Sequence, residues 1–184
     1  SSGNGLDGTL VEGALGGHGF EAGPVGQALK LDHDIPTLTS DTTEGTNVQV
    51  PLTLPEVGAI ALWYRPAPYY NYQNLFNTTG QADDWEMWIY ADGVVRGRVD
   101  GNVGQTSYQL ERAGEWYHIV YTWWKGGQAR LFVNGEERDT SSIIRGISDR
   151  QYAAALLGDT FFVGGGAGGN TSPQYRLYGL RLVH

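Results

Sequence analysis

The alternation of apolar and polar positions predicts β-strands along most of the chain. The period of two is clearest over residues 116–124. One parity of this stretch consists of Tyr117, Ile119, Tyr121 and Trp123. The other parity consists of Trp116, His118, Val120, Thr122 and Trp124. Further strands are predicted at 27–31, 47–50, 58–65, 85–90, 94–99, 105–110, 129–133, 136–140, 160–163 and 174–183.

Two of these strands raise the question of which surfaces are covered. Residues 58–65 are apolar on both parities, which predicts a central strand buried on two sides. Trp63, Trp116, Tyr117 and Trp123 have apolar neighbours and are interpreted as core residues, and His118 as a core histidine. The alternative for 116–124 is that one row of rings forms a platform for a flat, apolar ligand such as a sugar ring.

Tight turns separate the predicted strands. Asp92-Gly93 predicts a hairpin between 85–90 and 94–99, and Asn134-Gly135 supplies the positive φ values of a type I′ turn. Gly126-Gly127 predicts a further reversal, so 116–140 is expected to be a three-strand meander.

One short helix is predicted. Ser148 is a candidate N-cap for residues 149–157, and Gly158 follows the last turn. No linker and no internal repeat is visible. We therefore predict one all-β domain over residues 1–184, an antiparallel two-sheet sandwich with one short helix.

Composition excludes several classes of protein. The net charge of −8 argues against nucleic-acid binding, which requires a basic face. No apolar run approaches the roughly 20 residues of a membrane helix, so no membrane insertion is expected. The chain has no cysteine, which excludes disulfides and thiolate metal sites.

Several segments, taken in their order and spacing, resemble the laminin-G-like, concanavalin A-like jelly-roll domains of bacterial extracellular proteins. These segments are SSGNGLDGTLV (1–11), GQALKLD (26–32), GAIALWY (58–64), GEWYHIV (114–120), RLFVNG (130–135), FVGG (162–165) and YGLRLV (178–183). The resemblance implies a two-sheet jelly roll, a location outside the cell or on its surface, and a role in recognition. The family's usual first strand has no counterpart ahead of Ser1, so the chain is expected to be processed, truncated or completed by another segment.

Rings and polar side chains that coincide in turns are the candidate ligand contacts. A sugar offers an apolar C–H face, which rings can cover, and a rim of hydroxyl groups, which Asn and Asp can bind. The expected glycan-binding residues are Tyr69, Tyr70, Asn71, Tyr72, Asn74, Asp83, Asp84 and Trp85. The alternatives are that 66–74 covers an open end of the sandwich or contacts a protein, and that 81–86 is a solvated turn.

The polar segment 31–44 is the candidate calcium site, since calcium prefers clustered oxygen ligands. The expected ligands are Asp32, Asp34, Asp41 and Glu44. In the similar family, an acid at the position of Asp32 helps to hold a structural calcium ion. A second family acid, on the closing strand, is replaced here by Tyr178 or Gly179. The alternative is a solvated acidic loop.

These observations predict a non-catalytic extracellular recognition module that binds a glycan or a protein surface. An alternative is a structural, adhesive, filament or surface-layer module that self-associates or accepts a strand from a neighbour. A jelly-roll hydrolase or lyase is the third interpretation. Asp84 and Glu86 lie two residues apart, as paired acids of glycosidases can, but no third acid accompanies them.

Overall fold

A computed structural model describes most of the chain. The described residues are 9–11, 16–24, 26–33, 47–51, 57–66, 73–78, 86–89, 92–98, 105–112, 114–124, 126–141, 160–163 and 175–183, some of them by backbone alone. Fourteen strands and no helix occur in this part of the chain. The helix predicted at 149–157 lies outside it.

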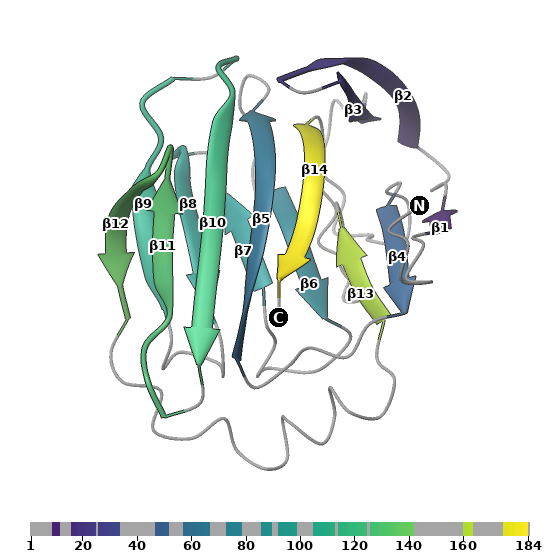
Figure 1. The fold of residues 1–184 in the computed structure, drawn as a ribbon. Coiled ribbons are helices and arrows are strands. Elements are labelled where there is room, and N and C mark those ends of the chain that lie inside the picture. The colour runs from purple at the N-terminus through teal and green to yellow at the C-terminus, as the bar shows by residue number, and fades with distance from the viewer. Residues whose placement is uncertain are drawn as a thin grey trace.

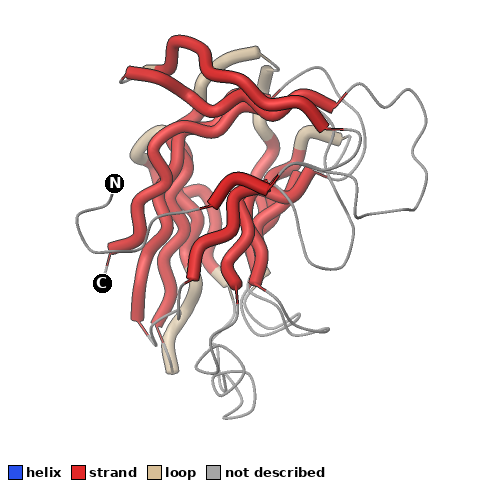
Figure 2. Tube along the Cα trace, turned by 90° about the vertical axis from the view of Figure 1, so that its right-hand side faces the viewer, coloured by secondary structure: helices blue, strands red, loops and turns tan. Residues whose placement is uncertain are grey.

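The strands form two antiparallel sheets (Figures 1 and 2). Sheet A has the spatial order β1 (Thr9–Val11), β4 (Asn47–Pro51), β13 (Thr160–Val163), β6 (Gln73–Thr78), β7 (Glu86–Ile89), β8 (Val94–Arg98) and β9 (Thr106–Gln109). Sheet B has the order β12 (Glu136–Thr140), β11 (Arg130–Val133), β10 (Tyr117–Trp124), β5 (Val57–Pro66), β14 (Tyr175–Val183), β3 (Gly26–His33) and β2 (Gly16–Gly23). This is the predicted jelly-roll sandwich.

Three strands were not predicted. β2 has the sequence GGHGFEAG, in which four of the eight residues are glycine, so it shows no alternation of apolar and polar side chains. β6 contains polar residues at Gln73, Asn74, Asn77 and Thr78, and its first two residues belong to the segment 66–74, which the sequence predicts to be a loop. β1 is only three residues long. β1 and β6 are held by pairing with strands distant in the sequence, and β2 by pairing at an edge of sheet B. The local alternation of side chains does not report such pairing.

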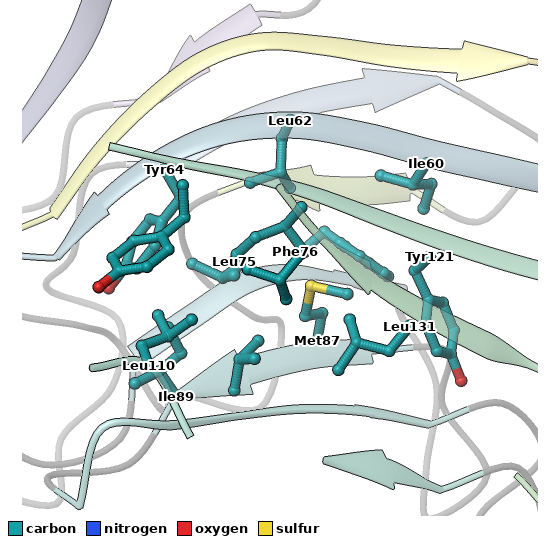
Figure 3. Packing of buried hydrophobic residues seen from close by; sticks show 14 of the residues in the cluster. Ile60, Leu62, Tyr64, Leu75, Phe76, Met87, Ile89, Leu110, Tyr121 and Leu131 are labelled. Carbon is teal, nitrogen blue, oxygen red and sulfur yellow. The ribbon is translucent and has the colours of Figure 1, made fainter. Parts of the chain in front are cut away.

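The hydrophobic core lies between the sheets (Figure 3). Ile60, Leu62 and Tyr64 project from β5 toward Phe76 and Met87 of sheet A. All five side chains are almost completely buried. Burial of side chains this large supplies most of the stability of a sandwich.

The two sheets approach closely at Gly97 and Tyr121. Gly97 lies on β8 and Tyr121 on β10, and a Cβ atom added to Gly97 would be 2.7 Å from the Tyr121 Cε2 atom. The ring of Tyr121 therefore occupies the space that a side chain at residue 97 would need. Burial raises the pKa of the Tyr121 hydroxyl well above its usual value.

The predicted turns are confirmed. Asn134 has φ 53° and Gly135 φ 82°, the positive values expected of a type I′ turn. At the β7–β8 hairpin Gly93 has φ 75°, and the backbone N–H of Val94 donates to Asp92 Oδ1 at 2.9 Å. Gly126 has φ 78° in the turn between β10 and β11. Together these turns make β10, β11 and β12 the expected meander.

Candidate functional site

The outer face of sheet B carries several aromatic side chains that do not belong to the core. Along β10 the odd positions are buried, and the even positions are half-buried. Tyr117 and Trp123 belong to the core, as predicted. The prediction is wrong for Trp63, Trp116 and His118, which lie half-buried on the opposite side of the sheet. β5 is likewise buried on one side only, because its second row lies on this outer face.

Trp63 and His118 form the middle of this surface. The register of β5 and β10 places them opposite each other, and their ring centroids are 5.0 Å apart with planes tilted by 38°. The backbone N–H of His118 donates to Asn134 Oδ1 at 2.9 Å, and the Asn134 N–H donates to the His118 carbonyl at 2.8 Å. The type I′ turn therefore fixes the end of β10 that carries His118.

Arg65 and Trp116 extend the surface toward the end of the sandwich. The Arg65 guanidinium lies 5.1 Å from the centroid of the Trp116 ring, within the range of a cation–π contact. Arg65 Nη2 also donates to Oε1 of Glu21, which lies on β2, at 2.5 Å. Both charged side chains are about a quarter exposed, so this contact fixes Arg65 more than it stabilises the fold. We call Glu21, Trp63, Arg65, Trp116 and His118 the Trp63 cluster.

A second ring and cation lie at the far end of the same face. The Arg130 guanidinium lies 5.2 Å from the centroid of the Trp124 ring and 3.5 Å from Glu137 Oε2. Gly127 leaves room for this indole, because a Cβ atom there would overlap the Trp124 side chain. Trp116 directly precedes β10 and Trp124 ends it, eight residues further along, a separation of about 26 Å. The Arg65–Trp116 and Arg130–Trp124 contacts therefore lie at two separate positions on the same face.

The predicted glycan-binding residues fall mainly outside the described residues. This applies to Tyr69, Tyr70, Asn71 and Tyr72 and to Asp83, Asp84 and Trp85. Asn74 lies on β6, where the register places it opposite Trp88 of β7. These contacts stay a prediction.

The structure does locate the ends from which the two predicted segments depart. Residues 67–72 join Pro66, next to Arg65 at the end of β5, to Gln73 at the start of β6. Residues 79–85 follow Thr78, at the other end of β6. Six strand residues span about 17 Å, so the tyrosine-rich and acidic segments are attached at opposite ends of this strand. The Trp63 cluster lies at the tyrosine-rich end.

The predicted calcium ligands are similarly placed. Asp32 lies on β3, and Asp34, Asp41 and Glu44 lie outside the described residues. β3 and β5 run in the same direction, because each is antiparallel to β14. Residues 34–46 therefore leave sheet B at the same end as residues 67–72. No group of three or more metal-ligating side chains occurs among the residues described, and calcium stays a prediction.

Glu86, one of the two acids considered for catalysis, takes part in a buried ion pair. It lies on β7 with 5% of its surface exposed, and its Oε1 is 2.8 Å from Arg98 Nε. The Arg98 guanidinium lies 5.5 Å from the centroid of the Trp88 ring. Removing one partner of such a pair leaves an uncompensated buried charge, so Glu86 has a structural role.

No helix long and apolar enough to cross a membrane is present in the described ranges. The two antiparallel sheets, with rings and polar groups at one end, define a lectin-like jelly-roll domain. The sequence matches the family described as the concanavalin A-like lectin/glucanases superfamily over residues 41–173, more than half of the chain. The protein belongs to this family.

Solved structures share the fold. The receptor binding domain of botulinum neurotoxin D is 14% identical, with a TM-score of 0.64 over 97% of this chain and 44% of that one. The structure named HCR/D-Sa-GBL1/C is 13% identical, with a TM-score of 0.68 over 99% and 44%. The ligand binding domain of botulinum neurotoxin serotype D in complex with N-acetylneuraminic acid is 14% identical, with a TM-score of 0.61 over 97% and 43%.

Identities this low establish the fold alone. The chain spans less than half the length of each of these structures. No curated protein sequence is similar enough to count as a relative.

Proposed function

We propose that this protein is a non-catalytic, extracellular recognition module that binds a glycan at the Trp63 cluster and the tyrosine-rich segment attached beside it. The observation that carries the proposal is the row of half-exposed rings, Trp63, His118 and Trp116, on one end of an outer sheet face. Fixed aromatic rings suit the apolar face of a sugar, and Arg65 and Asn134 lie next to them with polar groups for its hydroxyls. The glycan complex of a structurally similar toxin domain supports the same class of ligand.

Binding accounts for this surface better than hydrolysis does. A glycosidase needs two carboxyl groups about 5–10 Å apart on either side of the scissile bond. Among the described residues of the Trp63 cluster, Glu21 is the single carboxylate, and it is engaged by Arg65. Glu86 lies in sheet A and is paired with Arg98. The enzymatic interpretation therefore has no pair of acids among the described residues of the Trp63 cluster.

Calcium belongs to this proposal as a structural ion. Asp32, Asp34, Asp41 and Glu44 would hold the segment 32–44, which leaves sheet B beside the Trp63 cluster. The ion would fix the shape of a loop next to the ligand without touching the chemistry of binding.

A glycan array, probed with and without chelator, tests the proposal. We expect Trp63→Ala and Trp116→Ala to weaken binding of the best glycan about tenfold, as the loss of one central aromatic contact does. Trp124→Ala is the matched control, because it removes the same ring type from the same face of β10 at its far end. Equal binding by all three variants and the wild type would refute the site.

A second function, assembly with a neighbouring chain, is favoured by one observation. β2 is an outermost strand of sheet B as described, and Phe20 on it is 66% exposed. An exposed strand edge with a large apolar side chain can accept a partner strand. Light scattering distinguishes the two functions, since a monomer at high concentration whose mass is unchanged by Phe20→Asp would exclude this one.

A further inference from the structure

Positive residues line up in a row beside the Trp63 cluster. The register places Arg65 of β5 opposite Arg176 of β14, and Arg176 opposite Lys30 of β3. Neighbouring strands lie about 4.8 Å apart, so the row crosses about 10 Å of the outer face. We call Lys30, Arg176 and Arg65 the basic row. Trp116 continues it on the next strand, because the Arg65 guanidinium lies over the Trp116 ring.

The outer face of sheet B has a charge opposite to that of the whole chain. By strand register, its positions include the basic residues Lys30, Arg65, Arg130, Arg176 and Arg181. The acidic residues on the same positions are Glu21, Asp32 and Glu137. Counted over the described strand positions of this face, the net charge is +2 with histidine neutral, whereas the chain, with 12 basic and 20 acidic residues, has −8. Basic residues are concentrated on the face that also carries the rings.

The row of rings and the basic row are adjacent. Tyr178 and Trp63 are opposite each other, two residues along their strands from Arg176 and Arg65. Two strand residues span about 7 Å, close to the width of one sugar ring with its exocyclic group. A sugar stacked on Trp63 would thus bring an acidic substituent to the basic row.

We infer that this face selects anionic glycans, that is, sugars bearing a carboxylate or sulfate group, with the sugar ring on Trp63 and the acidic group at the basic row. The inference rests on the proposed glycan-binding function and names the class of glycan. Hydrogen bonds from Arg and Lys to an anionic oxygen are about twice as strong as those between neutral groups, which is the source of the selectivity. A nucleic acid is disfavoured as the ligand, since it would meet the strongly negative remainder of the chain.

Matched pairs of sugars provide the test. The array should carry uronic acid oligosaccharides and their methyl esters, sulfated and desulfated oligosaccharides, and sialylated and desialylated ones. The best pair is then titrated against the folded protein by calorimetry. We expect the acidic member to bind at least tenfold more tightly than its neutral partner. The ratio of the two affinities should fall when NaCl is raised from about 0.05 to about 0.5 M, because salt screens charge–charge contacts over about 10 Å or less.

Two variants assign the selectivity to the basic row. Arg176→Gln and Lys30→Gln should each weaken binding of the acidic sugar about tenfold and leave binding of the neutral partner unchanged. Either one decides the matter if the other fails to fold. Arg138→Gln is the control, because Arg138 lies over the Tyr108 ring and outside the outer face.

The outcomes separate this inference from the function on which it rests. Binding of neutral and acidic sugars with equal affinity, or an acidic preference untouched by both basic-row variants, overturns the inference and leaves glycan binding in place. Binding to no sugar on the array overturns glycan binding itself. The matched pair with the largest ratio of acidic to neutral affinity, whether uronic, sulfated or sialylated, identifies the kind of anionic group that the face binds.

Discussion

Replacing Gly97 by alanine tests the contact between the two sheets. The added Cβ would lie 2.7 Å from Tyr121 Cε2 and 3.1 Å from both Cδ2 and Cζ of the same ring. Real Cβ atoms do not approach other atoms this closely, and the Tyr121 side chain is buried, with 1% of its surface exposed. β8 or the ring must therefore shift, which costs about 1–3 kcal/mol for an overpacked core.

The assay is urea unfolding followed by tryptophan fluorescence. A domain of this size has a stability of about 5–15 kcal/mol, so the expected loss lowers the unfolding midpoint measurably. The melting temperature should fall by about 2–4 °C for each kcal/mol lost. Gly19→Ala is the matched control, because Gly19 is also a strand glycine and a Cβ there would meet nothing within 4 Å.

A double variant shows whether Tyr121 is the cause. Tyr121→Leu removes the ring atoms that the new Cβ would strike, so Gly97→Ala should cost much less in that background. If Gly97→Ala were as stable as Gly19→Ala, or if its cost were the same with and without the Tyr121 ring, the close approach of the sheets would be refuted.

Three further predictions concern the Asn134 turn, the Asp92 carboxylate and the candidate calcium site. Asn134→Ala should lower the free energy of unfolding in urea by about 2 kcal/mol, because alanine disfavours the left-handed backbone and cannot accept the hydrogen bond from the His118 N–H. Asn134→Gly should cost about half as much, because glycine tolerates φ 53°. The Arg96 hydrogen bond holds the pKa of Asp92 below its usual value of 3.8. The stability that this carboxylate contributes is therefore present above pH 3.8 and is lost as pH falls through the lower pKa of the folded state. The free energy of unfolding of Asp92→Asn should depend less on pH below about 4, and a pH curve identical to that of the wild type would contradict this. Calcium should raise the melting temperature of the wild type and chelator should lower it, whereas a variant with Asp34, Asp41 and Glu44 changed to Asn, Asn and Gln should respond to neither.

The sequence was sufficient for most strands because their signals are local. Period-two alternation and the turns Asp92-Gly93 and Asn134-Gly135 located the β7–β8 hairpin and the β10–β12 meander within a few residues. β2 was missed because half of its residues are glycine, and a glycine strand has no side chains to alternate. Its place is set by the eight residues of β3 with which it pairs in a hairpin, and alternation of side chains does not report that pairing.

Alternation also left the direction of each face undecided. Both parities of 116–124 carry large rings, so the pattern could not say which row meets sheet A. The structure decides it through Gly97, which gives the Tyr121 ring the space between the sheets and leaves Trp116 and His118 outside. As a result, Trp116 and His118 lie on the outer face of sheet B, although the sequence predicted them to be core residues.

The topology explains why segments far apart in the sequence belong to one candidate site. The chain crosses from sheet B to sheet A after β3 and again after β5, and returns to sheet B between β13 and β14. The parallel directions of β3 and β5, with β14 antiparallel between them, require all three crossings to occur at one end of the sandwich, the upper end in Figure 1. Residues 34–46, 67–72 and 164–174 are thus attached around the Trp63 cluster, whereas residues 79–85 are attached at the opposite end. A ligand on Trp63 would therefore lie near the points where residues 34–46 and 67–72 leave sheet B, so substitutions of Asp83, Asp84 and Trp85 are expected to weaken its binding less than substitutions of Tyr69, Tyr70 and Tyr72.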